Sequence, residues 1–336
     1  MKRIFDMPYH PRSILAIDLS PFCRSLAVLP ALRCLRAAYP QARLVVAASR
    51  ATCEILAVTG LAALIDLGAL RSGDRGRGFA LKSLIRLVRV GRRETFDLML
   101  DFSPGVETQI ASGLIPHVRL VRPSKLRNLV DVLFGGRGRR TGDHAAECRN
   151  VIGQLGLEVI DEDSGVFVPV DEHKRFEQLL VRHQSRGGEP IVVLYGSSAI
   201  AQRGSVVECL SEVAVRLANN FGARIVAVDE PMSRTFTACV SSSLPRGSIK
   251  VVSPRALEAA AAMARASMAI TDDPELVNMT SGFRTPMLEV RSGSFRAHPP
   301  QPDQGAAEPG NTLADDVFEA ACRMLQGSRF PSLFQS

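Results

Sequence analysis

The sequence has 336 residues, of which 46% are hydrophobic and 22% are charged. These values indicate a folded globular protein, exclude wholesale disorder, and at this length predict two domains of ordinary size. The formal net charge of +7 indicates an anionic partner without identifying it. No stretch reaches the ~20 apolar residues that a membrane-spanning helix needs, so we expect none.

The seven cysteines form no C-x-x-C pair and no cluster with histidine at zinc spacing. This pattern favours a reducing compartment with mostly buried thiols. The basic N-terminal segment leads into a strand-length apolar run and shows no small-residue cleavage site, so we read no signal peptide. We therefore expect a cytoplasmic protein with no metal ion and no cofactor.

The first half alternates short apolar runs with helical patterns, which predicts parallel strands joined by helical crossovers. The expected strands are residues 14–18, 44–48, 63–67 and 96–101, and the expected helices are residues 25–42, 52–58 and 144–156. Pro30 is expected to kink the first helix.

Two basic segments accompany these elements. Residues 81–93 mix arginines with leucine, isoleucine and valine in the pattern of a basic amphipathic helix. The simpler interpretation is a crossover helix with its charges in water, and the second is contact with an anionic membrane. The basic residues of segment 81–93 are Lys82, Arg86, Arg89, Arg92 and Arg93. The second basic segment ends in the glycine-rich residues 135–142, which either bind phosphates or form a solvated loop.

The second half repeats the α/β rhythm. The expected strands are residues 191–195, 223–229, 249–252, 268–270 and 287–290, and the expected helices are residues 175–183, 205–220, 257–266 and one that begins near Thr312. A loop rich in proline and glycine is expected at 292–311. The fold class is α/β, with doubly wound, Rossmann-type domains at residues 1–165 and 166–336, and the last helix packing back.

Gly196, Ser197 and Ser198 follow the clearest buried strand and precede a helix. Backbone N–H groups and hydroxyls at such a point suit a phosphate group. The segment is not a P-loop, since G-x-x-x-x-G-K-[ST] is missing. It is not a nucleophile elbow either, since Ile200 stands where the last glycine of G-x-S-x-G is required.

The stretch from Ser267 to Val290 reads as strand, acidic turn, short helix and strand. In a doubly wound sheet this turn lies at the carboxyl ends of the strands, where ligands bind. Asp272 or Asp273 can also cap the helix, with Pro274 in its first turn. The turn is thus a candidate site, and a helix cap is the alternative role for Asp273.

In order and spacing, these motifs resemble those of the heptosyltransferase family, glycosyltransferase family nine. The matching segments are Ser20–Arg24 before Leu29–Leu32, Phe96–Leu98, His144 with Leu155–Leu157, Gly196–Ser198, Asp273, and Thr285–Pro286. The resemblance implies a GT-B fold, with two Rossmann-type domains facing across a cleft. It also implies sugar transfer from a nucleotide diphosphate donor, such as ADP-heptose, to an acceptor such as lipopolysaccharide core.

The sequence departs from the family pattern at the positions to which the resemblance assigns the general base and the phosphate contacts. The family's general base, an aspartate, falls on Arg24, which cannot accept a proton. The basic residue expected after the Gly-Ser-Ser turn falls on Gln202, with Arg203 next to it. In the last motif, Pro274, Glu275 and Asn278 replace serine, glycine and histidine.

The resemblance assigns roles to the following residues. The replacement base is Asp18 or Asp101, with Glu275 as a further carboxylate. Donor and phosphate contacts are expected from Arg24, Ser197, Ser198, Arg203, Asp273, Glu275 and Asn278. Acceptor contacts are expected from Arg119, Arg122 and Lys125.

Three functions remain open. The first is a divergent glycosyltransferase that uses a nucleotide sugar and an anionic glycan or lipid acceptor, in the cytoplasm or at the inner membrane face. The second is an inactive relative that binds a nucleotide or a partner transferase. The third is a polyanion-binding α/β protein. Aromatic residues make up 5% and tryptophan is absent, so no specific nucleic-acid partner is expected.

Overall fold

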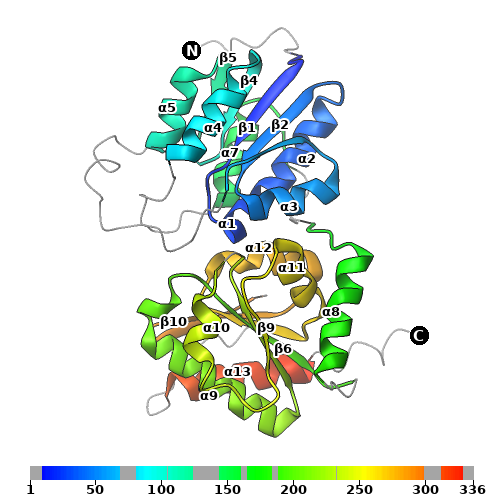
Figure 1. Ribbon diagram of the computed structural model, residues 1–336, viewed down its shortest axis with the longest axis vertical. Helices are drawn as coiled ribbons and strands as arrows, with labels where there is room; N and C mark the ends of the chain where they lie inside the picture. The colour runs from blue at the N-terminus through cyan, green and yellow to red at the C-terminus, as the bar shows by residue number, and fades with distance from the viewer. Residues whose placement is uncertain are drawn as a thin grey trace. The chain divides into compact units, whose positions relative to one another are not determined.

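The computed structural model describes residues 10–68, 81–103, 105–123, 144–159, 165–183, 188–231, 233–298 and 312–327. These residues form two compact units, one before residue 165 and one from Gly165 on. Each unit is a sheet with helices on both faces (Figure 1). The described residues thus confirm the α/β fold class that the alternating pattern predicts.

The described residues of unit 1 form a five-stranded parallel sheet in the order β3-β2-β1-β4-β5. In chain order the elements are β1 (Ser13–Ile17), α1 (Phe22–Ser25), the 3₁₀ helix η1 (Leu26–Val28), α2 (Leu29–Ala38), β2 (Arg43–Ala48), α3 (Arg50–Thr59), β3 (Ala63–Asp66), α4 (Leu81–Gly91), β4 (Phe96–Asp101), α5 (Val106–Leu114), β5 (His117–Val121) and α7 (His144–Gly153). Except for β5, these strands were predicted, with ends within one residue.

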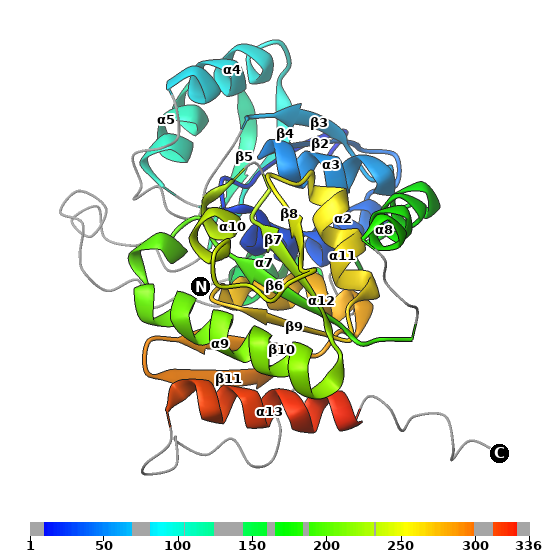
Figure 2. The ribbon, with the colours of Figure 1, turned by 60° about the horizontal axis from the view of Figure 1, so that its bottom comes forward.

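Helices α4 and α5 lie side by side on one face of this sheet (Figure 2). Their inward side chains join alternate strand residues in one buried cluster, which contains Leu15, Met99, Leu87, Ala111 and Ile115 among others. Helices α2 and α7 contact each other on the opposite face. Burial on both faces explains why the strands read as continuous apolar runs.

Two local predictions for unit 1 need correction. Instead of the single helix expected at 25–42, the chain forms α1, η1 and α2 in succession, and α2 ends at Ala38. Pro30 lies in the first turn of α2 and does not kink a longer helix. Proline has no N–H to donate, and the first turn is where none is needed. Helix α5 and strand β5 were not predicted.

The described residues of unit 2 form a six-stranded sheet in the order β11-β10-β9-β6-β7-β8, parallel except for β11. In chain order the elements are α8 (Val170–Arg182), β6 (Ile191–Gly196), η2 (Ile200–Gln202), α9 (Gly204–Phe221), β7 (Arg224–Asp229), α10 (Thr235–Val240), β8 (Ile249–Val251), α11 (Ala256–Arg265), β9 (Met268–Thr271), η3 (Pro274–Leu276), α12 (Val277–Phe283), β10 (Met287–Arg291), β11 (Ser294–His298) and α13 (Leu313–Gly327).

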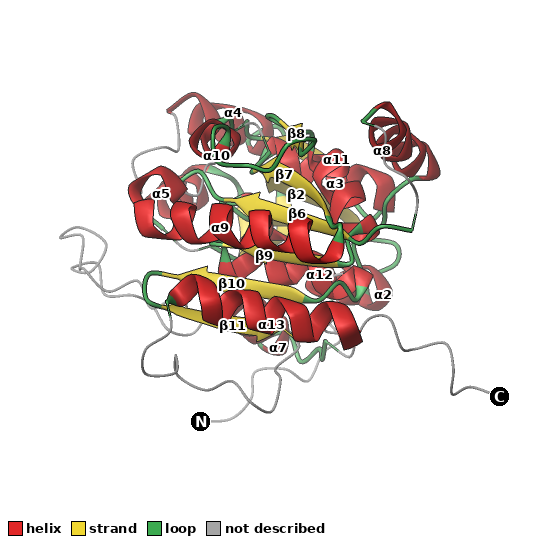
Figure 3. Ribbon diagram, turned by 90° about the horizontal axis from the view of Figure 1, so that it is seen from below, coloured by secondary structure: helices red, strands yellow, loops and turns green. Residues whose placement is uncertain are grey.

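Helices α9, α10 and α13 share one buried cluster with the sheet of unit 2, and α13 packs against α9 (Figure 3). Helices α8, α11 and α12 contact one another in sequence, with α11 against β6 and β7. The expectation of a loop from residue 292 is wrong for residues 294–298, which form β11. Ser292 and Gly293 make the hairpin turn, with Gly293 at φ +79°, so the two strands pair directly.

Candidate functional site

Each sheet reverses its strand order at one point, and several of the predicted site residues lie at these points. In unit 1 the order reverses between β1 and β4. Asp18 directly follows β1, and Asp101 is the last residue of β4. In unit 2 it reverses between β6 and β9, which precede Ser197 and Asp272. Ligands of doubly wound sheets bind outside the carboxyl ends of the strands at such reversals.

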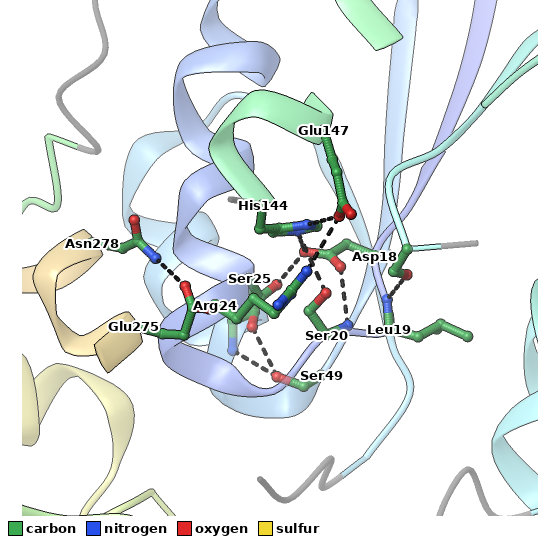
Figure 4. Close-up of polar contacts among 12 residues, drawn as sticks. Asp18, Leu19, Ser20, Arg24, Ser25, Ser49, His144, Glu147, Glu275 and Asn278 are labelled. Carbon is green, nitrogen blue, oxygen red and sulfur yellow. Dashed lines mark hydrogen bonds and ion pairs between the residues drawn. The ribbon is translucent and has the colours of Figure 1, made fainter. Parts of the chain in front are cut away.

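Asp18 of unit 1 is fully buried and surrounded by donors (Figure 4). The Ser20 N–H donates to its Oδ1 at 3.0 Å, and the Ser25 hydroxyl donates to its Oδ2 at 2.7 Å. The Nε2 atom of His144, from α7, lies 3.6 Å from Oδ2. Burial by itself would raise the pKa of Asp18, but the His144 charge and these hydrogen bonds hold it well below its usual range.

His144 is the cation of this buried pair. It is 1% exposed, and burial alone would lower its pKa, yet the neighbouring Asp18 carboxylate raises the pKa to about 12. Its Nδ1 atom lies 3.2 Å from Oε2 of Glu147. Both ring nitrogens therefore face carboxylates, as an imidazolium requires.

Ser20, His144 and Glu147 have the order of a nucleophile, a base and an orienting acid. The Ser20 hydroxyl lies 3.4 Å from Nε2 of His144. A base must be neutral to take the serine proton, however, and the His144 pKa of about 12 keeps the ring charged. Ser20, His144 and Glu147 therefore belong to one electrostatic network with Asp18.

Arg24, at the position where the resemblance places the general base, ends this network. Its Nη2 donates to Oε2 of Glu147 at 3.2 Å, and its side chain is 23% exposed (Figure 4). The charges alternate from Asp18 through His144 and Glu147 to Arg24. The guanidinium is thus held at the edge of unit 1 by a chain of alternating charges that is buried at Asp18 and His144 and partly exposed at Glu147.

Asp101 differs from Asp18 although the two carboxylates end neighbouring strands. It is 1% exposed, and burial raises its pKa to about 6. The Ser103 N–H donates to its Oδ1 at 3.2 Å, and Nε of Arg122 lies 3.4 Å from its Oδ2. Within the described residues neither that Oδ2 nor that Nε makes a hydrogen bond.

The three predicted acceptor contacts do not form one cluster among the described residues. Arg122 lies against Asp101, and its Nη2 donates to the Ser112 hydroxyl at 2.5 Å. Arg119, on β5, donates to the Gln154 carbonyl at 3.4 Å. Lys125 lies outside the described residues.

In unit 2 the backbone donors after β6 are already occupied. The Ser197 N–H and hydroxyl donate to the two carboxylate oxygens of Asp272, at 2.7 and 2.6 Å. The Ser198 N–H donates to Oε2 of Glu230 at 2.9 Å. The groups that we expected to hold a phosphate therefore hold carboxylates of the protein in this structure.

Gly196 of the same turn has a packing role. A Cβ atom at this position would lie 2.0 Å from Cγ of Phe236, which belongs to α10. Phe236 is fully buried in the core of unit 2. The glycine therefore lets the aromatic ring pack on the backbone at the end of β6.

Asp273 caps the short helix that follows β9, as the capping alternative predicts. Its Oδ1 accepts the Glu275 N–H at 3.0 Å. Burial, followed by the charges of Glu230 and Asp272, raises its pKa to about 8. Near neutral pH this carboxyl is therefore mostly protonated, unlike Asp18.

Arg203 forms an ion pair with one of these carboxylates, that of Asp272. Its Nη1 donates to the carbonyl and to Oδ2 of Asp272, at 3.1 and 3.3 Å, and its side chain is 42% exposed. Glu275 and Asn278 pair with each other, with the Asn278 amide donating at 3.3 Å (Figure 4). Their polar ends therefore restrain each other.

Three of these residues were given no role at a site by sequence reasoning. They are Glu147, Glu230 and His144, which the family resemblance quoted only as part of a helix motif. Glu230 follows a predicted strand, so its place at the carboxyl edge was a usable signal. Asp272 lies in the turn that was a candidate site, but only a capping role was considered for it.

The described residues contain neither a cluster that could hold a metal ion nor a helix that could span a membrane. No group of three or more histidine, cysteine, aspartate or glutamate side chains is arranged there to hold a metal ion. In the same part of the chain no helix has the length and apolar character to cross a membrane.

No protein-family model matches the sequence, and no curated protein does. Solved structures match in fold. A glycosyl transferase family 9 structure from Veillonella parvula DSM 2008 gives a TM-score of 0.68 at 16% identity, covering 96% of this chain and 99% of that one. The E. coli heptosyltransferase WaaC with ADP-2-deoxy-2-fluoro heptose gives 0.60 at 17% identity, covering 93% and 99%.

A second group of enzymes has the same architecture. The UDP-GlcNAc 2-epimerase from Neisseria meningitidis bound to UDP-GlcNAc gives a TM-score of 0.53 at 11% identity, covering 94% of this chain and 91% of that one. At such identities the likeness shows the fold alone. The chain has the two-unit GT-B fold of the glycosyltransferase family 9 structures, as its motif order predicts.

Proposed function

We propose that the protein is a divergent glycosyltransferase of the heptosyltransferase type, which takes a sugar from a nucleoside diphosphate donor in the cytoplasm. The observation that carries the proposal is the fold match, which spans 96% of this chain. Further support comes from the charged groups that gather at both strand-order reversals. The heptosyltransferase WaaC was crystallised with ADP and with an ADP-sugar, and we extend a donor of this class to the present chain.

Asp101 is the better of the two proposed bases. Transfer to a hydroxyl is assisted by a base whose pKa lies near the working pH, and the Asp101 pKa is about 6. Asp18 is held ionised by His144, so it has little affinity for a further proton. Since Asp101 is 1% exposed, the proposal requires that the acceptor displace the side chains that cover it.

Arg203 is the proposed donor contact in unit 2. Its guanidinium is 42% exposed, and charge-assisted hydrogen bonds to phosphate are among the strong ones. Protonated Asp273 would add a donor without repelling a diphosphate. On the acceptor side, Arg122 would neutralise anionic groups, with Arg119 and Lys125 as further proposed contacts, and Arg24 stays a proposed phosphate contact.

The direct test follows nucleotide binding and sugar transfer separately. Titration with ADP, UDP, GDP and their sugars should reveal one saturable nucleotide. Arg203→Ala should weaken that binding about tenfold or more, whereas Arg296→Ala, at an exposed position on β11, should not change it. Asp101→Asn should reduce transfer at least ~100-fold with nucleotide binding intact. Asp66→Asn, at the end of β3, is the matched control.

A second candidate, a nucleotide-binding protein without transferase activity, is favoured by one observation. Asp272 and Glu230 occupy the backbone donors of Ser197 and Ser198. If these carboxylates exclude a diphosphate, Glu230→Gln should tighten nucleotide binding while no sugar is transferred to any acceptor extract. Transfer by the unmodified protein would rule out this candidate, and isomerisation of the sugar nucleotide without transfer would contradict both.

A further inference from the structure

The outer face of α4 combines arginines with an exposed isoleucine. Ile85 is 49% exposed, and Arg89, Arg92 and Arg93 are exposed at positions that follow it at helical spacing. The inner face carries Leu87, which is fully buried against the sheet. The helix is therefore a packed crossover on one side, as expected, and a basic apolar surface on the other.

Helix α5 and the start of β5 extend this surface. Ile110 and Leu114 are each 45% exposed and one helical turn apart, and Val118 is 69% exposed. These three residues and Ile85 are four of the eight large apolar side chains that are exposed among the described residues. Single exposed apolar residues are common, but this grouping on three neighbouring elements, α4, α5 and β5, is not random scatter.

Close packing holds the apolar and basic parts together. A Cβ atom on Gly91, the last residue of α4, would lie 2.7 Å from Cδ1 of Ile115, so the ends of α4 and α5 meet. Arg92 and Arg93 directly follow Gly91, and Leu114 directly precedes Ile115. Figure 2 shows the two helices side by side. Apolar and cationic side chains thus share one surface.

The arginines of this surface are uncompensated within the described residues. No ion pair there involves Arg89, Arg92 or Arg93, and α4 contains no acidic residue in its sequence. Glu94, the next acid along the chain, pairs with Arg43 at 2.6 Å. The surface therefore presents positive charge together with aliphatic side chains.

We propose that the outer surface of α4 and α5, formed by Ile85, Arg89, Arg92, Arg93, Ile110 and Leu114, docks on an anionic lipid bilayer. A bilayer interface accepts both components, because lipid phosphates pair with arginine while aliphatic side chains enter the acyl boundary. A nucleic acid would use the charges but leave the aliphatic groups without a partner, and aromatic stacking residues are missing from the surface. The proposal does not depend on transferase activity.

The test uses the full chain and vesicles of two compositions. The protein should sediment with equimolar phosphatidylglycerol and phosphatidylcholine vesicles, and only weakly with phosphatidylcholine alone. Arg89→Glu with Arg92→Glu should reduce partitioning at least ~10-fold, since each basic residue near an anionic surface contributes about fivefold. Ile85→Ser with Leu114→Ser should reduce it several-fold. Val181→Ser, 73% exposed on α8, and Arg296→Glu are the matched controls and should change little.

A second measurement locates the contact even if a charge-reversal variant folds poorly. The chain has no tryptophan, so Leu114→Trp creates a single fluorescent reporter. Its emission should shift to the blue on anionic vesicles, whereas that of Val181→Trp should not. Equal binding to both vesicle types, equal losses in the controls, or no shift for Leu114→Trp would overturn the proposal. The proposal would also be overturned, in favour of a nucleic-acid partner, by binding to duplex DNA that is tighter than binding to vesicles. In that case the double variant Ile85→Ser, Leu114→Ser would bind the DNA as well as the native chain does.

Discussion

Asp18 in unit 1 and Asp273 in unit 2 follow strands at the reversal points of two similar sheets, yet their pKa values are shifted in opposite directions. Both are buried. Asp18 lies beside His144 and stays ionised, with its pKa below the usual range. Asp273 lies beside Glu230 and Asp272, and its pKa is raised to about 8. The same fold thus stabilises a buried carboxyl group either by pairing it or by protonating it.

The difference bears on what each edge can bind. The edge of unit 1 carries alternating charges that end in Arg24, whereas the edge of unit 2 gathers carboxylates around Arg203. An anionic ligand in unit 2 therefore depends on protonation of Asp273 and on Arg203. In unit 1 the same ligand would meet a network in which the positive and negative side chains already neutralise one another.

Removing the cation of the buried pair should have the largest effect. His144→Ala leaves Asp18 buried without its partner, and such losses cost about 3–5 kcal/mol of unfolding free energy. Chemical denaturation with hydrogen exchange of β1 and α7 amides measures the loss within unit 1. The double variant Asp18→Asn, His144→Gln removes both charges and should lose less. A loss for His144→Ala below ~1 kcal/mol would contradict the pairing.

The pH dependence of Asp273→Asn should come next. The folded-state pKa of about 8 exceeds the unfolded value of 3.8, so the stability contributed by Asp273 is full below about pH 4 and is lost as the pH rises through 8. Asparagine keeps the cap but cannot ionise. The variant should match the native chain near about pH 4 and exceed it by several kcal/mol at about pH 9.

Asp18→Asn is the counterpart and should behave in the opposite way. The folded-state pKa of Asp18 is lowered, so its contribution is present above the unfolded value and lost as the pH falls towards the folded one. This variant should be less stable near neutral pH, with the deficit shrinking in acid. Parallel stability curves for either variant and the native chain would refute the assigned charge state.

Gly196→Ala should show whether the glycine is required for packing against Phe236 or for binding a ligand at the edge of unit 2. The added methyl group meets Phe236, and overpacking of this kind costs about 1–3 kcal/mol. Thermal unfolding followed by circular dichroism measures it. Gly204→Ala, where a Cβ would meet nothing within 4 Å, is the control and should stay within ~0.5 kcal/mol. Unchanged stability with lost nucleotide binding would assign Gly196 to the ligand instead.

Glu147→Gln should have the smallest effect. The Glu147 side chain is 38% exposed, so its pairing with Arg24 is screened by water. Glutamine can still accept a hydrogen bond from His144. We expect a loss of about 0.5–1 kcal/mol in the denaturation experiment used for His144. A loss as large as that of His144→Ala would show that the network is stabilised from its exposed end.

Most of the sheet architecture could be predicted because parallel strands buried on both faces are continuous apolar runs in the sequence. The residues Ile14–Ile17 and Ile191–Tyr195 show this pattern, and their ends mark the carboxyl edges where Asp18 and Ser197 stand. Strand β11 escaped prediction because Gly293 and the prolines after it resemble a loop. Its pairing with β10 exists only in three dimensions.

The α/β fold class, the positions of both carboxyl edges and the amphipathic pattern of α4 can be predicted from the sequence, because each depends on local periodicity or on residues at strand ends. The pKa shift of each buried carboxyl depends instead on tertiary contacts. His144 meets Asp18, and Asp272 occupies the N–H of Ser197, only when distant segments pack together. Desolvation and the charges of neighbours set a buried pKa, and neither follows from local sequence.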